Sequence, residues 1–132
     1  MTRIAIDAPT ALRIVTEGIA IPAAHSLVGP AILRSHALST IYRDAREGRI
    51  DSGEARRRLD GIATLKIRLL GDRVSRARAF TLAEQLGWDD TALAEYLAVA
   101  SLQADVLATD DSVLVTAAEG IIPVGSLDEL LP

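Results

Sequence analysis

The chain of 132 residues is 49% hydrophobic and 24% charged, which excludes an intrinsically disordered protein and suffices for one domain with its own core. It contains no cysteine, so disulfides, thiolate zinc sites and a cysteine nucleophile are excluded, and a reducing, cytoplasmic location is expected. No apolar run approaches the roughly 18 residues of a membrane span, and Asp7 interrupts the N-terminal apolar run, so we predict neither a membrane segment nor a signal peptide.

The net charge of −4 conceals an uneven distribution along the chain. Residues 1–78 hold all 14 Lys and Arg side chains and 8 acids, whereas residues 79–132 hold 10 acids and no Lys or Arg. One interpretation is a molecular dipole without a partner. The other is a basic face that binds a polyanion beside an acidic pocket that binds cations. Thirteen of the 14 basic residues are Arg, whose planar guanidinium suits phosphate.

The first predicted elements are a strand over residues 3–6, which ends at Asp7, and a helix over 10–17 with Pro9 in its first turn. Residues 18–30 contain two Gly and two Pro and are predicted to be mostly loop. Ser52 and Asp89 are the predicted N-caps of two later helices. The remaining predicted elements, in chain order, are helices 31–47 and 52–65, strand 67–70, helices 74–86 and 90–102, strand 105–108, helix 112–118, strand 121–124 and a terminal helical turn.

Short apolar strands that alternate with helices predict a single α/β domain over residues 1–132, with a small parallel sheet and helices on both faces. The active crevice of such a sheet lies at the carboxyl ends of its strands. Asp7 and Asp111 both follow a predicted strand and are expected at that edge. Carboxylates there suit Mg²⁺, and a pair of such ions can activate water for phosphodiester cleavage. Dinucleotide, Walker and Gly-x-Ser-x-Gly motifs are absent from the sequence.

Four stretches in order, at residues 4–7, 29–38, 86–96 and 104–111, carry a resemblance over the whole chain to PIN domains, and specifically to VapC-type toxins of toxin–antitoxin pairs. The resemblance implies a PIN-like three-layer domain and an endoribonuclease that depends on Mg²⁺ or Mn²⁺ held by four acidic residues. It also implies an RNA substrate, a cognate antitoxin and a homodimer. Asp7 and Asp111 match two of the four acidic positions and are the expected catalytic and metal-binding residues.

The other two acidic positions of the pattern fall on His36 and Leu93. Leucine cannot ligate a cation, and imidazole suits Mn²⁺ or Zn²⁺ better than Mg²⁺. Asp90 precedes Leu93 by three residues, a helical spacing that makes it the candidate replacement. We therefore expect weak or absent metal binding and reduced ribonuclease activity. The alternative is a catalytically inactive PIN module that binds an antitoxin, RNA or itself without cleavage.

Each candidate residue also has a plain structural interpretation. Asp7 and Asp111 suit helix N-caps, Asp90 suits a first turn, and His36 on a long helix is more often packed than ligating. Thr109 either hydrogen-bonds within the site, which makes it a candidate substrate-binding residue, or only ends its strand. Arg56, Arg57 and Arg58 either form a solvated face or contact RNA or a partner.

Overall fold

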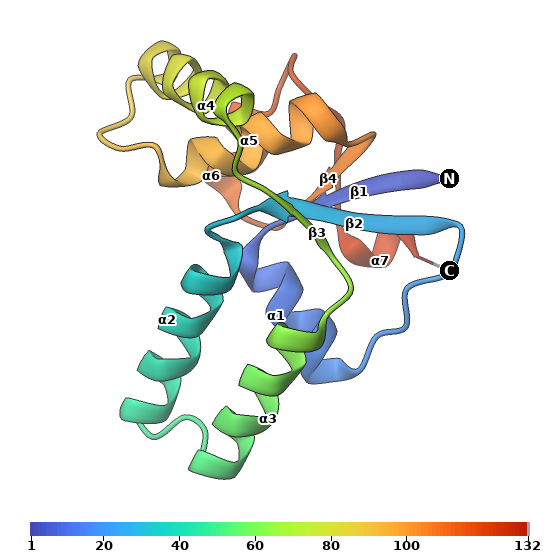
Figure 1. Ribbon diagram of the computed structural model, residues 1–132, viewed down its shortest axis with the longest axis vertical. Helices are drawn as coiled ribbons and strands as arrows, with labels where there is room; N and C mark the ends of the chain where they lie inside the picture. Colours follow the sequence, from blue (N-terminus) through green and yellow to red (C-terminus); the bar gives the residue numbers. More distant parts are fainter. Residues whose placement is uncertain (132) are drawn as a thin grey trace.

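Five parallel strands in the order β3-β2-β1-β4-β5 form the central sheet of this computed structural model, which describes residues 1–131 (Figure 1). Helices cover both faces of the sheet, so the fold class is the predicted one. The elements in chain order are β1 (Thr2–Ile6), α1 (Ala8–Glu17), β2 (His25–Pro30), α2 (Leu33–Arg46), α3 (Ser52–Thr64), β3 (Arg68–Leu70), α4 (Arg73–Leu86), α5 (Ala92–Gln103), β4 (Val106–Ala108), α6 (Ser112–Ala117), β5 (Val124–Gly125) and α7 (Leu127–Leu130).

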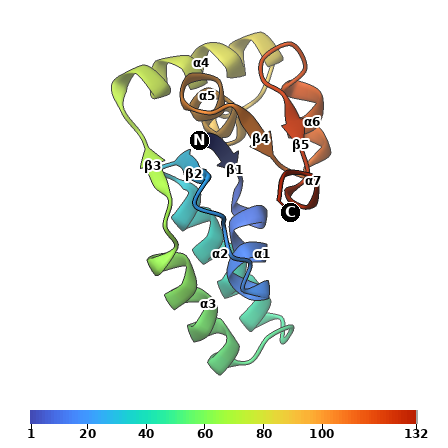
Figure 2. The same cartoon turned by 90° about the vertical axis from the view of Figure 1, so that its right-hand side faces the viewer.

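The helices divide into two groups around the sheet, with α4, α5 and α6 on one face and α1, α2, α3 and α7 on the other (Figure 1). The strands β1 and β4 lie at the centre, and their Ile4, Ile6 and Leu107 are fully buried. Helix α5 is buried from Tyr96 to Ala100 because it lies between the sheet and α4. The α2–α3 hairpin extends away from the sheet, as both views show (Figures 1 and 2).

The prediction of loop over residues 18–30 is confirmed for residues 18–24 and wrong for residues 25–30, which form β2, an inner strand of the sheet. Gly29 is needed there, since a Cβ atom at this position would lie 2.9 Å from Leu33 Cδ1. Pro30 is tolerated because it is the last strand residue, and the N–H of Ala31 donates to Leu70 O at 2.8 Å in its place. Gly29 and Pro30 suggest a loop in the sequence, but both are strand residues, and their neighbours in the sheet explain why each is accommodated there.

Two predicted N-caps are wrong, and one strand is displaced. Asp51, not Ser52, caps α3 and accepts a hydrogen bond from Glu54 N. Helix α5 begins only at Ala92, so Asp89 is not its N-cap. The last strand lies at 124–125 rather than at 121–124, because residues 121 and 122 still donate to a carbonyl of the turn after α6. None of the helices within residues 1–131 has the length and hydropathy needed to cross a membrane.

Candidate functional site

Asp7 directly follows β1 and is only 3% exposed, yet both of its carboxylate oxygens have hydrogen-bond donors. Oδ1 accepts from the backbone N of Thr10 at 2.9 Å, which makes Asp7 the N-cap of α1. Oδ2 accepts from Thr109 Oγ1 at 2.5 Å. The hydroxyl of Thr10 donates to Ala108 O at 3.2 Å and ties the first turn of α1 to β4. The Asp7 carboxylate is therefore fixed in position, and each oxygen retains acceptor capacity for a further partner.

Thr109 joins Asp7 to Asp111, the second acid expected at this edge. Its hydroxyl donates to Asp7 and accepts from the backbone N of Asp111 at 3.0 Å. Asp111 is the N-cap of α6, and its Oδ1 accepts from Val113 N at 2.9 Å and from Leu114 N at 3.1 Å. The two acids thus lie near each other, as expected for the carboxyl edge, and both also have the capping role of the plain interpretation.

A small pocket of about 290 Å³ opens where these residues meet. Asp7 and Asp111 line it together with Asp110 and Arg13. Arg13 is already paired, through Nε with Glu17 at 3.0 Å and through Nη2 with Asp128 at 2.7 Å, and these bonds raise its pKa above the ordinary value. Since Arg13 is shared with two acids outside the pocket, the pocket is predominantly acidic. Arg13 was not predicted, because only the three-dimensional arrangement brings it here, and a lining role of Asp110 was not predicted although it directly precedes Asp111.

His36 lies in α2 and contacts Tyr96 of α5 instead of joining a cluster of acids. Its Nδ1 is 2.7 Å from Tyr96 Oη, and the two rings stack with their centroids 5.7 Å apart. Burial raises the pKa of Tyr96 above its ordinary value, and the negative charges of Asp7 and Glu95 raise it further. The phenol therefore keeps its proton and is available to donate to Nδ1. This pair was not predicted, because 60 residues separate its members.

Leu93 is half-buried at the start of α5 and packs against the core. Asp90 is exposed and precedes the helix, with its Oδ1 accepting from Ala92 N at 3.0 Å. The assumption that Asp90 and Leu93 share one helical face is therefore wrong. The two residues nevertheless line one shallow pocket of about 210 Å³, together with Trp88, Asp89 and Val113.

The donor set does not fit a Mg²⁺ site. Within residues 1–131, no three His, Asp or Glu side chains are grouped so that they could hold a metal ion. Asp7 and Asp111 are close through Thr109, but the side chains at the other two positions offer a tyrosine-bound imidazole and a hydrocarbon. Mg²⁺ requires near-octahedral oxygen coordination, and two carboxylates already engaged by protein donors provide a weak basis for it.

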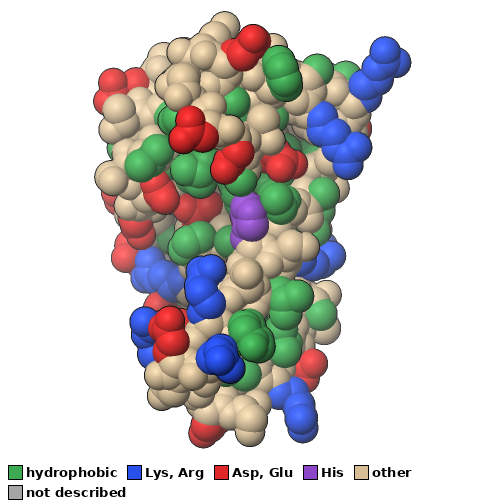
Figure 3. Space-filling model, turned by 90° about the vertical axis from the view of Figure 1, so that its left-hand side faces the viewer, with side chains coloured by type: hydrophobic (Ala, Val, Ile, Leu, Met, Phe, Trp, Pro, Cys, Tyr) green, Lys and Arg blue, Asp and Glu red, His purple; other side chains and the backbone are tan. Residues whose placement is uncertain are grey.

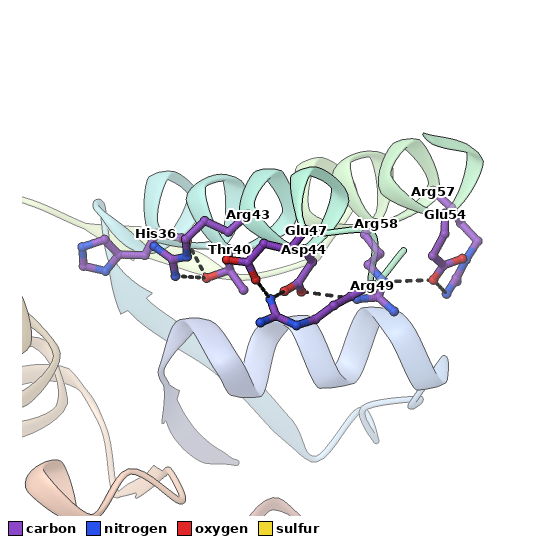
Figure 4. A network of polar contacts seen from close by, with 9 residues as sticks. All are labelled: His36, Thr40, Arg43, Asp44, Glu47, Arg49, Glu54, Arg57 and Arg58. Atoms are coloured by element: carbon purple, nitrogen blue, oxygen red, sulfur yellow. Dashed lines mark hydrogen bonds and ion pairs between the residues drawn. The ribbon is translucent and has the colours of Figure 1, made fainter. Parts of the chain in front are cut away.

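Arg56, Arg57 and Arg58 lie in the first half of α3, near the far end of the α2–α3 hairpin (Figure 1). Glu54 accepts from Nη2 of Arg57 at 2.7 Å and from Nε of Arg58 at 2.9 Å, and these bonds lower the pKa of Glu54 to about 2. These contacts belong to a chain of ion pairs along the hairpin (Figure 4). The structure therefore does not bring the three arginines to the edge with Asp7.

Charges are also unevenly distributed over the surface (Figure 3). Acidic side chains are the more frequent on the upper part of this face, where some basic side chains also lie, and both signs of charge occur over the α2–α3 hairpin. The division of charge along the sequence is therefore only partly reproduced in space, because α4 carries Arg73, Arg76 and Arg78. Asp89, Asp90, Asp110 and Asp111 belong to the turns that precede α5 and α6.

Comparisons with known proteins provide a fold relationship. No family model matches the chain, and no curated protein matches it. Among solved structures, the chain is similar to the crystal structure of PAE2754 from Pyrobaculum aerophilum, with a TM-score of 0.75 and 23% sequence identity. The match covers 98% of this chain and 92% of that chain. A likeness of this extent at this identity shows that the two chains share the α/β fold.

Proposed function

We propose that this chain is a PIN-type domain of the VapC toxin kind with a reduced acidic site, which acts by binding and cleaves RNA slowly or not at all. The four sequence stretches that resemble this family support the classification. The parallel α/β fold is the one that the resemblance implies. It provides the sheet edge at which such a domain carries its acids.

One observation carries the proposal of reduced activity. Asp7 and Asp111 are joined through Thr109, while the two positions that would complete the acidic set hold His36 and Leu93. Removing two carboxylates removes two of the negative charges that offset a dication and two of its preferred ligands. The two remaining carboxylates are therefore expected to hold a dication too weakly for efficient metal-dependent cleavage.

The charge of the edge pocket favours a basic protein segment over RNA as the partner. Asp7, Asp110 and Asp111 line the pocket, and their carboxylates repel phosphate unless a cation neutralises them. An arginine from an antitoxin-type partner is the chemistry that complements this pocket, because its planar fork matches carboxylates. RNA and a second copy of the chain are the competing partners. A titration with arginine amide, followed by NMR, should shift the backbone amides of Thr109 and Asp111 if this preference is correct.

A metal-dependent ribonuclease is the second candidate function, and the position of Asp90 favours it. Asp90 lines the same shallow pocket as Leu93 and is exposed, with one oxygen engaged by a backbone N–H. A movement of the turn at residues 88–91 would bring the carboxylate of Asp90 closer to Leu93, which occupies a position where the PIN pattern has an acid. Under this alternative, Asp90→Ala abolishes metal binding while the fold persists.

The deciding experiment is a calorimetric titration of the protein with Mn²⁺ and Mg²⁺, with Asp7→Asn as the control variant. The proposal predicts dissociation constants in the millimolar range or weaker, and RNA cleavage no faster than that of the variant. Micromolar binding that Asp7→Asn abolishes would overturn the proposal and support the ribonuclease. Circular dichroism of both proteins verifies that the variant is folded.

A further inference from the structure

The cavity at the amino ends of the strands is larger than the pocket beside Asp7. It has a volume of about 650 Å³ and lies between residues 19–23, the first residues of β2 and residues 65–68 (Figure 2 faces this end of the sheet). Its apolar lining comes from Ile19, Ile21, Leu27, Leu65 and Ile67. Volume and lining are those of a cavity that accepts a small organic molecule.

Two cationic side chains, Lys66 and Arg68, line this cavity, and no Asp or Glu side chain of residues 1–131 lines it. Burial alternates along residues 65–68, so that Leu65 and Ile67 are partly buried while Lys66 and Arg68 are exposed. This alternation directs the two charged side chains to the same side of an extended segment. Neither cation forms an ion pair with the acids of residues 1–131. Hydrogen bonds from Ser75 are the main cause of the lowered pKa of Asp72, and the charge of Arg68 is a minor one.

His25 also lies in the wall of the same cavity. Its Nδ1 is buried and has no hydrogen-bond partner in the described part of the chain. The backbone N of His25 donates to Pro22 O at 2.9 Å, which holds the start of β2 against the loop. A buried polar atom of a protein is normally hydrogen-bonded, so His25 Nδ1 is an exception, but it has almost no accessible surface and is not a group that a ligand in the cavity contacts.

We propose that this cavity binds a small aliphatic carboxylate. The hydrocarbon chain of the ligand packs among the five apolar side chains, and its carboxylate accepts hydrogen bonds from Lys66 and Arg68. The cavity is at the edge of the sheet opposite Asp7 and Asp111, so the inference stands or fails independently of the proposed function.

The test is a titration of the ¹⁵N-labelled protein with octanoate, below its micelle-forming concentration, followed by NMR. We expect saturable shifts of the Leu27 and Ile67 amides. The double variant Lys66→Gln/Arg68→Gln should bind at least about tenfold more weakly, because it loses charge-assisted hydrogen bonds. The matched control is Arg46→Gln/Arg56→Gln, which removes two exposed arginines that do not line the cavity, and should bind as the wild type does.

Two further ligands test the head group. Octanamide keeps the chain and removes the charge, and should bind about tenfold more weakly than octanoate. Octyl phosphate distinguishes a carboxylate site from a phosphate site. The proposal is overturned if octanoate causes no saturable shift of the cavity amides, if octanamide or octyl phosphate binds as well as octanoate, or if Lys66→Gln/Arg68→Gln leaves the affinity unchanged. Because Lys66 and Arg68 are both exposed, the variant Lys66→Gln/Arg68→Gln retains the core and is expected to fold.

Discussion

The hydroxyl of Thr109 donates to Asp7 Oδ2 at 2.5 Å and so joins two residues that are 102 positions apart. The register of the sheet explains this contact. Ile6 of β1 is paired with Ala108 of β4, so the next residue of each parallel strand, Asp7 and Thr109, leaves the sheet beside its neighbour. Asp111 is then brought in by its backbone N–H, which donates to the same hydroxyl. The edge thus depends on one small hydroxyl that satisfies a buried carboxylate and a backbone amide together.

Replacing Thr109 by Val removes this hydroxyl while it preserves the branched shape of the side chain. We expect the free energy of unfolding to fall by about 1–3 kcal/mol, because a buried carboxylate and an amide each lose a partner. Urea denaturation of the two proteins measures the difference. The control is Thr81→Val on the exposed side of α4, for which we expect a change within about 0.5 kcal/mol. Equal effects of the two substitutions would show that the Thr109 bridge contributes nothing to stability.

Tyr96 should make the protein less stable at alkaline pH, because its phenol ionises more readily in the unfolded chain than in the folded one. Burial raises the pKa of Tyr96 in the folded state above the ordinary 10.0, with Asp7 and Glu95 as further causes. Above pH 10 the unfolded chain therefore binds fewer protons at this residue than the folded chain, and stability decreases as the pH rises. The stability advantage of the wild type over Tyr96→Phe should be about 1 kcal/mol at pH 7, from the hydrogen bond to His36.

This advantage should decline as the pH rises from about 9 to about 11, since phenylalanine does not ionise. Denaturation midpoints of both proteins across this range provide the measurement. Tyr42→Phe is the matched control, because Tyr42 is 62% exposed. A pH-independent difference between the wild type and Tyr96→Phe is the result that contradicts the prediction.

The contact between α1 and α3 requires a glycine at position 61. A Cβ atom on Gly61 would overlap Val15 Cγ1 of α1. Gly61→Ala should therefore destabilise the protein by about 1–3 kcal/mol, although alanine favours a helix by about 1 kcal/mol relative to glycine. In the same helix, Gly53→Ala meets only Asp51 Oδ1 at 3.4 Å and should stabilise by up to about 1 kcal/mol. Thermal unfolding of both variants tests the pair, and Val15→Ala should restore much of the stability that Gly61→Ala removes.

The alternation of apolar strands and helices was sufficient to predict the parallel sheet and both helical layers. It failed at β2, where only Leu27 and Val28 are both apolar and large, and where Gly29 and Pro30 follow. In isolation this stretch has the composition of a loop. What makes it a strand is nonlocal, namely pairing with β1 on one side and β3 on the other. Sequence patterns report local preference, and a central strand is decided by its neighbours.

The sequence predicts only the part of the candidate site that follows directly from the order of strands and helices. Asp7 and Asp111 follow strands, so their position at the carboxyl edge could be inferred from topology alone. The contact of His36 with Tyr96 could not, because it depends on how α2 and α5 lie on opposite faces of the sheet edge. The position of Asp90 depends on where α5 begins, and helix boundaries are uncertain by a few residues in any prediction from sequence.

The final prediction tests the proposed function by restoring the acidic set. His36→Glu combined with Leu93→Asp adds two carboxylates at the positions that the PIN resemblance assigns to acids. We expect Mg²⁺ or Mn²⁺ affinity at least about tenfold above that of the wild type, because hard dications bind more strongly as oxygen ligands and negative charge are added. Calorimetry measures the affinity, and Asp7→Asn in the double-variant background should abolish the gain.

The matched control places the same two acids elsewhere on the same helices, as Ser39→Glu in α2 and Leu102→Asp in α5, both exposed positions. If any added negative charge were enough, this control would gain as much affinity as the restored protein. A folded His36→Glu/Leu93→Asp protein that binds metal no better than the wild type would show that these positions do not face Asp7 and Asp111 as a common site. A gain without RNA cleavage would instead mean that a ligand set is not sufficient, and that the acidic edge is adapted to holding a basic partner.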